Sequence, residues 1–135
     1  MRTGVSQATA VTYATEMIGI TANTSFLLLD LREPEEYNLW RIKESINFPA
    51  PNIARDKMIP DLYRFKNQPE KLIIVYMLDE RQGTQYAQMF TEKGFENLYL
   101  LSGGCEGFLE KYVELCEGRA VPVPKSQIAA EEAQR

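Results

Sequence analysis

The sequence of 135 residues contains no histidine and only two cysteines, Cys105 and Cys116. The lack of histidine excludes histidine general bases, Ser-His and Cys-His catalytic pairs, and most zinc sites. The two cysteines have no metal-type spacing, so we expect neither a bound metal nor a cofactor. Such sparing use of cysteine is typical of a reducing compartment and indicates a cytoplasmic protein.

Long apolar runs and a strong charge of one sign are also absent. No stretch is apolar for long enough to span a bilayer, and Met1-Arg2-Thr3 does not lead into a signal peptide. The 15 basic and 19 acidic side chains give a net charge of −4, which argues against nucleic acid and anionic membranes as partners. The length and the ordinary hydrophobic content suit one compact domain.

Short apolar runs alternate with amphipathic stretches along the chain. The runs predict strands at residues 26–30, 45–49, 72–76 and 97–101. The amphipathic stretches predict helices at residues 34–39, 52–65 (broken near Pro60), 82–93 and 104–116. This alternation predicts an α/β fold with a central parallel sheet of four to five strands and helices on both faces.

The two ends of the chain differ from this pattern. Residues 1–11 are small and polar, and we expect a flexible N-terminus; residues 12–20 have the spacing of a short helix or an irregular lead-in. The domain is then expected over residues 12–118. Residues 119–135 begin with Val121-Pro122-Val123-Pro124 and end without an apolar stripe, which predicts a peripheral C-terminal arm that docks on something rather than folding alone.

One loop joins the end of a buried strand to the start of a helix. It consists of Met77, Leu78, Asp79, Glu80, Arg81 and Gln82, called here the 77–82 loop. Ligands of open α/β sheets bind beyond the carboxyl ends of the strands, and the backbone N–H groups of such a loop favour anions. The loop nevertheless contains no nucleophile, so the site is built for chemistry but lacks catalytic groups.

Four segments resemble the rhodanese-like domain family, in order and at the right separations. Asp30-Leu31-Arg32-Glu33-Pro34-Glu35-Glu36-Tyr37 resembles its Asp-Val-Arg-Glu-Pro-x-Glu-Tyr opening, and Ser45-Ile46-Asn47-Phe48-Pro49 resembles the end of its Ile-Pro-Gly-Ala-Ile-Asn-Ile-Pro segment. Ile74-Val75-Tyr76 precedes the position of its catalytic loop. Residues 94–104 resemble its closing Gly-Phe-x-Asn-Val-x-x-Leu-x-Gly-Gly. The match covers roughly residues 12–115 and implies a single rhodanese-like domain.

The resemblance also implies that this chain has no catalytic residue. Active members place Cys-x-x-Gly-x-Arg after the tyrosine, and the cysteine thiolate accepts a sulfur atom. Here the cysteine position holds Met77, the glycine position Glu80 and the arginine position Gln82. A thioether cannot become a persulfide, and Asp79 and Glu80 repel an anionic sulfur donor. The family's neighbouring Gly-His has become Trp40-Arg41, and sulfurtransferase activity is therefore not expected.

A finer resemblance indicates where such a domain works. Asp79-Glu80-Arg81 and Phe95-Glu96-Asn97-Leu98 resemble a ciliary and basal-body member of the family that also lacks the catalytic cysteine. That member is associated with tubulin glutamylation. The resemblance implies a non-catalytic protein-interaction or structural module of a cilium or centrosome. Its implied partner is a protein such as tubulin or a tubulin-modifying enzyme.

Each residue of possible function also has a structural interpretation. Asp79 and Glu80 form either an acidic recognition loop or caps of the following helix. Arg81 either recognises a carboxylate of a partner or forms a local ion pair with Asp79, Glu80 or Glu33. Trp40, beside Arg41, either anchors a partner or packs over the degenerate pocket.

Three further interpretations stay open at this point. Asp30 and Arg32 are expected to form the structural ion pair of the opening motif. Cys105, at a helix start, could carry sulfur or could be a small buried residue, and Cys116 is a weaker case of the same kind. An enzyme using the loop pocket, or a sensor that binds a small anion through the loop amides, is the alternative to an interaction module.

Overall fold

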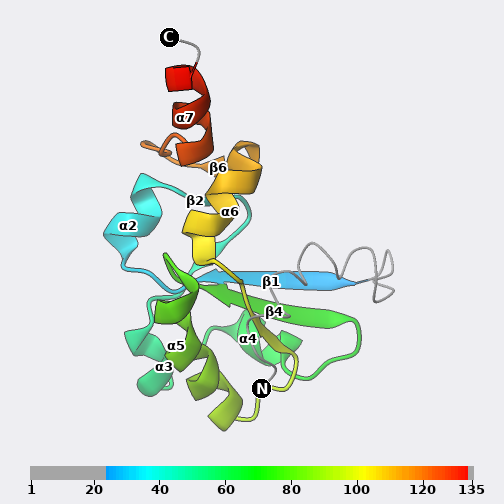
Figure 1. Cartoon of the computed structure of the whole chain (residues 1–135). Coiled ribbons are helices and arrows are strands. Elements are labelled where there is room, and N and C mark those ends of the chain that lie inside the picture. Colours follow the sequence, from blue (N-terminus) through cyan, green and yellow to red (C-terminus); the bar gives the residue numbers. More distant parts are fainter. Residues whose placement is uncertain (1–23, 134–135) are drawn as a thin grey trace.

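The computed structural model describes residues 24–133 (Figure 1). The predictions for residues 1–11 and 12–20 lie outside the described residues. Within the described range no helix is both long and apolar enough to cross a membrane.

A parallel four-stranded sheet forms the centre of the fold, as the sequence predicted. Its strands are β1 (Ser25–Asp30), β3 (Ile46–Asn47), β4 (Lys71–Tyr76) and β5 (Leu98–Leu100), in the order β3-β1-β4-β5. β1 and β4 pair along their whole length, so that Asp30 lies opposite Tyr76. The carboxyl ends of the strands therefore meet at one edge of the sheet, where loops can form a common site.

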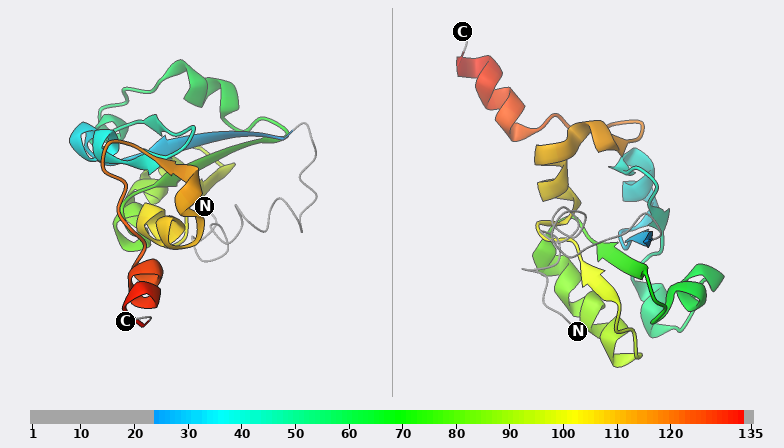
Figure 2. Two further views of the ribbon diagram at one scale, coloured as in Figure 1. Left: turned by 90° about the horizontal axis from the view of Figure 1, so that it is seen from above. Right: turned by 90° about the vertical axis from the view of Figure 1, so that its right-hand side faces the viewer.

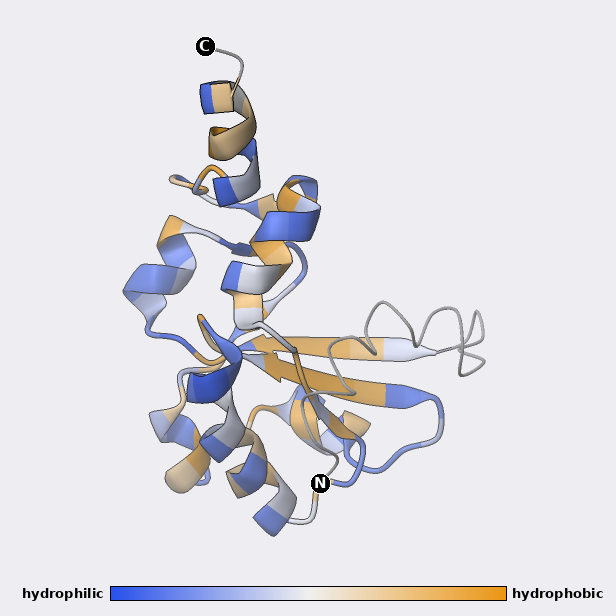
Figure 3. Cartoon of the chain, in the orientation of Figure 1, coloured by the Kyte–Doolittle hydropathy of each residue, from blue (hydrophilic) through white to orange (hydrophobic). Residues whose placement is uncertain are grey.

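Helices cover both faces of this sheet. α3 (Pro51–Ala54), α4 (Pro60–Phe65) and α5 (Glu80–Glu92) lie on one side, and α6 (Gly104–Tyr112) lies on the other (Figures 1 and 2). Successive strand residues point to opposite faces, so Ile73 and Val75 belong to the first core and Ile74 and Tyr76 to the second. Figure 3 shows β1 and β4 as mostly hydrophobic ribbons between more polar helices.

Two apolar cores result from this alternation. The first contains strand residues of one face together with residues of α3, α4 and α5, among them Leu29, Ile53, Leu62, Val75, Ala87, Phe90 and Leu100. The second contains Trp40, Ile42, Ile74, Tyr76, Leu101, Cys105, Leu109 and Cys116. Both cores end beneath the 77–82 loop, because Met77 packs against the first and Leu78 against the second.

A second, two-stranded sheet was missed by the sequence analysis. β2 (Arg41–Ile42) pairs antiparallel with β6 (Cys116–Glu117). The prediction of one helix over residues 104–116 was wrong at its end: α6 stops at Tyr112, a 3₁₀ turn, η1 (Val113–Leu115), follows, and Cys116 is in a strand. A strand of two residues gives no periodic signal in the sequence. In addition, β6 pairs with β2, which lies far away in the sequence, directly after α2 (Pro34–Leu39).

α2 has the predicted bounds of 34–39, whereas the start of α5 differs from the prediction for a local reason. α5 begins at Glu80 rather than at Gln82, because the Asp79 carboxylate accepts a hydrogen bond from Gln82 N at 2.8 Å and caps the helix. The predicted break of the stretch 52–65 near Pro60 is confirmed. The stretch is divided into α3 and α4, and Pro60 is the first residue of α4, where a missing N–H costs nothing. The strand expected at residues 45–49 is limited to Ile46–Asn47.

The chain after β6 crosses back over α2 before it forms a last helix. Ala120 N donates to Leu39 O at 2.9 Å, and Pro124 is buried. α7 (Lys125–Ala133) then projects away from the rest of the molecule (Figures 1 and 2). The Glu110 carboxylate accepts hydrogen bonds from Lys125 N at 2.9 Å and Ser126 N at 3.2 Å, which fixes the start of α7 on α6.

Candidate functional site

The 77–82 loop lies beyond the end of β4 and rests directly on the start of α6. Cys105 N donates to Met77 O at 3.0 Å, and Glu106 N donates to Leu78 O at 2.9 Å. Gly104 has a φ of +62°, and a Cβ there would lie 2.5 Å from Leu78 O. The close approach of the loop to α6 therefore requires glycine at this position.

The two acidic side chains of the loop are both used inside the molecule. The Asp79 carboxylate caps α5 through Gln82 N, as the capping interpretation predicted. The Glu80 carboxylate reaches the turn between β5 and α6: its Oε1 accepts a hydrogen bond from Ser102 Oγ at 2.5 Å and one from Gly103 N at 3.0 Å. Glu80 thus ties the 77–82 loop to a neighbouring loop, which the sequence analysis did not foresee.

Arg81 and Gln82 are the exposed residues of the loop. Of the two interpretations of Arg81, the local ion pair with Asp79, Glu80 or Glu33 is contradicted, because in the part of the chain that the structure describes Arg81 pairs with no carboxylate. The nearby carboxylates of Asp79 and Glu80 are instead turned towards backbone and hydroxyl donors. Arg81 is therefore an exposed cation beside two carboxylates that are already hydrogen-bonded.

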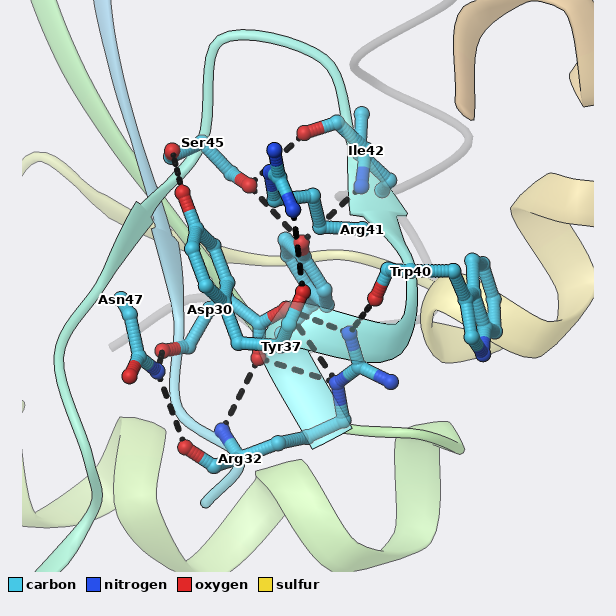
Figure 4. A network of polar contacts seen from close by, with 9 residues as sticks. Asp30, Arg32, Tyr37, Trp40, Arg41, Ile42, Ser45 and Asn47 are labelled. Carbon is cyan, nitrogen blue, oxygen red and sulfur yellow. Dashed lines mark hydrogen bonds and ion pairs between the residues drawn. The ribbon is translucent and has the colours of Figure 1, made fainter. Parts of the chain in front are cut away.

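The ion pair predicted between Asp30 and Arg32 is present and lies under the site (Figure 4). The Asp30 carboxylate accepts Arg32 Nη2 at 2.7 Å, Nε at 3.0 and 3.2 Å, and the backbone N of Arg32 at 2.9 Å. The two side chains are 0% and 2% exposed. Burial is the largest single effect and opposes the charged guanidinium, but hydrogen bonding to the Asp30 carboxylate and Coulombic attraction together outweigh it and hold the pKa of Arg32 above its usual value.

Trp40 and Arg41 are engaged in the fold rather than presented to solvent. Trp40 is 8% exposed, its carbonyl accepts Arg32 Nη2 at 2.6 Å, and its ring centroid lies 5.1 Å from the Arg32 guanidinium carbon. Of the two interpretations of Trp40, the packed one describes the structure. Arg41 pairs with Glu117 at 3.0 Å and lies over the ring of Tyr37 (Figure 4).

A buried tyrosine at the end of β4 joins the two sheets. The Tyr76 hydroxyl accepts a hydrogen bond from Ile42 N at 3.3 Å and donates to Ser45 Oγ at 3.1 Å, and Ser45 Oγ donates to Ile42 O at 2.7 Å. Burial, assisted by the charge of Asp30, raises the pKa of Tyr76 above its usual value. From the sequence, Tyr76 was predicted only to end a strand before the 77–82 loop, although a buried tyrosine hydroxyl requires a partner and was a usable signal.

Neither cysteine supplies a reactive thiolate. Cys105 is 0% exposed, and burial raises the pKa of its thiol to about 12. Burial raises the pKa of Cys116 to about 11. Because the thiolate is the reacting species, both thiols are inert at neutral pH, in line with the buried-residue interpretation. Residues 24–133 also contain no group of three acidic, cysteine or histidine side chains placed to hold a metal ion.

Comparison with known families and proteins gives one consistent result. The model of a family described as the rhodanese-like domain matches residues 11–111. The centrosomal protein of 41 kDa from Homo sapiens is 39% identical over 92 residues, which cover 66% of this chain and 24% of that protein. Its Xenopus tropicalis counterpart is 34% identical over 100 residues, covering 73% and 27%. The chain thus spans about a quarter of the length of these curated relatives, and the finer resemblance found in the sequence is confirmed.

Solved structures agree on the fold. The rhodanese-like domain of an Anabaena protein superposes with a TM-score of 0.60 at 24% identity, covering 87% of this chain and 80% of that one. A rhodanese-related protein from Thermoplasma volcanium gives a TM-score of 0.51 at 23% identity, with coverage of 64% and 78%. At this level of identity the likeness concerns the fold alone.

Proposed function

The chain belongs to the rhodanese-like domain family, and from this premise we propose that it is a non-catalytic member that serves as a protein-interaction or structural module. The 77–82 loop carries this proposal. Met77 stands where active members have the sulfur-accepting cysteine. The Glu80 carboxylate lies between the loop and the Ser102–Gly103 turn, to which it is hydrogen-bonded. A loop without a thiol and closed by its own carboxylate has no means of accepting sulfur.

The state of the two cysteines supports the same conclusion. Sulfur transfer elsewhere in the domain would need a thiolate that a donor can reach. Cys105 and Cys116 are both buried, and both have a raised thiol pKa. The enzymatic alternative through Cys105 therefore lacks a reactive group at neutral pH.

The relatives suggest where the module works. They are called centrosomal proteins, and we propose that this chain likewise acts at a centrosome, basal body or cilium. Its partner in this proposal is a protein of that setting, with tubulin or a tubulin-modifying enzyme as the first candidates, and its role is linked to tubulin glutamylation.

Arg81 is the residue of the site best placed to contact such a partner. Among the three residues that the sequence suggested for binding, Trp40 is buried and Arg41 is paired with Glu117, whereas Arg81 is exposed. A guanidinium that projects from a rigid helix start can hold a carboxylate through two parallel hydrogen bonds. This chemistry suits the glutamate side chains of an acidic protein tail.

The loss of catalysis is tested by restoring the loop. Thiosulfate-to-cyanide sulfur transfer is measured for the native chain and for the variant Met77→Cys/Glu80→Gly/Gln82→Arg. The variant Glu80→Gly/Gln82→Arg, which opens the loop without adding a thiol, is the matched control. We expect activity only when Met77→Cys is present. Activity of the native chain would refute the proposal and direct the next substitutions to Cys105 and Cys116.

The partner proposal is tested separately by binding. Purified tubulin with glutamylated tails is titrated against the native chain, Arg81→Ala and Arg55→Ala. Arg55 is another exposed arginine, at the end of α3. Loss of a charge-assisted contact predicts affinity roughly tenfold lower for Arg81→Ala and unchanged for Arg55→Ala. Equal affinity of all three proteins would exclude Arg81 from the interface, and no binding by the native chain would exclude tubulin.

A further inference from the structure

The turn before α6 provides a run of backbone donors, and all of them are occupied. Four of the backbone N–H groups of residues 103 to 107 donate to backbone oxygens: Gly104 N to Leu101 O, Cys105 N to Met77 O, Glu106 N to Leu78 O and Gly107 N to Gly103 O. The fifth, Gly103 N, donates to Glu80 Oε1, and all five distances are 2.9 to 3.1 Å. Only this last acceptor belongs to a side chain. Gly103 N is therefore the one donor of the run that can exchange its partner while the backbone stays in place.

The same acceptor atom takes a second hydrogen bond. Ser102 Oγ lies 2.5 Å from Glu80 Oε1, so one carboxylate oxygen receives a hydroxyl and an amide donor together. Gly103 is exposed and Ser102 is half-buried, so solutes can approach the turn from solvent. Two donors that converge on one oxygen at an accessible turn form a position complementary to an oxyanion.

We propose that Glu80 is an autoinhibitory ligand, which occupies an oxyanion-binding position formed by Ser102 Oγ and Gly103 N and so excludes small oxyanions such as sulfate and phosphate. A tethered carboxylate acts at a high effective concentration, so a free anion at millimolar level does not displace it. The neighbouring Asp79 carboxylate adds repulsion against any second anion. This inference goes beyond the proposed function, because it does not depend on the partner or on the place where the module acts.

The position of Glu80 in the loop supports this assignment. In the family's loop motif the corresponding position holds glycine, which has no side chain to reach the next loop. The carboxylate is thus an addition to the loop, and its removal leaves the backbone contacts of Met77 and Leu78 with α6 intact. Removing Glu80 is therefore expected to open the position without unfolding the loop.

The experiment compares variants that differ in this carboxylate. Glu80→Ala opens the position, Glu80→Gln keeps an amide oxygen that can accept both hydrogen bonds, and Glu80→Ala/Ser102→Ala removes one donor. Glu92→Ala, at the exposed far end of α5, changes the net charge by the same amount as Glu80→Ala. Each protein is titrated with sodium sulfate at constant ionic strength, with Tm and the backbone amide resonance of Gly103 as readouts.

A specific site has to be separated from the general stabilising effect of sulfate, which is excluded from protein surfaces. For Glu80→Ala we expect a saturable extra rise in Tm of roughly 5 °C once sulfate is ten times above its Kd, with a shift of the Gly103 resonance at the same midpoint. The native chain, Glu80→Gln and Glu92→Ala should show only the common, non-saturating rise. The double variant should bind at least tenfold more weakly than Glu80→Ala.

Two results would overturn the inference. One is a Glu80→Ala protein whose Gly103 resonance does not respond to sulfate. The other is a native chain whose Gly103 resonance shifts saturably, because then Glu80 does not exclude the anion. The second measurement needs no variant, so it can refute the inference even if Glu80→Ala is too unstable to study.

Discussion

The buried pair of Asp30 and Arg32 should dominate the stability of the region beneath the 77–82 loop. In Arg32→Met the Asp30 carboxylate stays buried and keeps the hydrogen bond from the backbone N of residue 32, but it loses its contacts with Nε and Nη2. The Trp40 carbonyl loses its donor as well. A buried charge left without its partner typically costs about 3–5 kcal/mol, and we expect a loss near 4 kcal/mol.

This loss is large compared with the whole stability of a domain. Domains of this kind unfold with about 5–15 kcal/mol, so Arg32→Met should lower the urea midpoint strongly with little change of the m-value. The control is Arg64→Met, which breaks an ion pair with Asp61 on the surface, where Arg64 is 70% exposed. An exposed pair contributes about 0–1 kcal/mol, so the control should unfold close to the native midpoint.

The double variant Asp30→Asn/Arg32→Met distinguishes an uncompensated charge from simple loss of packing. Removing both charges should restore part of the stability lost in Arg32→Met, since no buried carboxylate is then left unpaired. The measurement is urea unfolding followed by circular dichroism. A loss below 1 kcal/mol in Arg32→Met, or a double variant less stable than the single one, would show that the pair is not the source of the effect.

Three further predictions concern the second core and the loop. Cys105 in the folded chain should react with iodoacetamide about a thousandfold more slowly than in urea, because its thiol pKa is raised from 9.0 to about 12. The neutral thiol of Cys105 should also stabilise the fold fully below pH 9 and progressively less as the pH rises towards 12. Unfolding measured as a function of pH tests this dependence. Tyr76→Phe should cost about 1–3 kcal/mol in urea unfolding, because Ile42 N loses a buried acceptor; an unchanged midpoint would contradict the role of the hydroxyl. Gly104→Ala should lower the stability by at least about 2 kcal/mol, since a Cβ would lie 2.5 Å from a backbone oxygen of the loop at positive φ, whereas Gly107→Ala, with nothing within 4 Å, should be neutral or stabilising.

The functional interpretation depends on a pattern that the sequence carries locally. The apolar runs at β1 and β4 predicted two buried strands, and the order of the four family segments placed the 77–82 loop at the end of β4. The presence of Met77, and the lack of any cysteine in the 77–82 loop, is likewise visible in the sequence. Such features are predictable because strand periodicity, capping and motif spacing involve residues that are close along the chain.

Contacts between distant segments decided the rest. The pairing of β2 with β6 joins residues far apart in the sequence, and it buries Trp40, which the sequence left as either an anchor or a packed residue. The same is true of Glu80, whose partners Ser102 and Gly103 belong to another loop. No periodicity records which side chain will cross from one loop to the next.

The sequence by itself therefore determined the fold class, the family, the position of the loop and the absence of a nucleophile in it. Only the tertiary structure decided that Glu80 closes the loop and that Arg81 is exposed. The physical reason is the range of the interactions: backbone propensity and side-chain periodicity are local, whereas the direction of a charged side chain depends on the donors that the folded chain brings within about 3 Å of it.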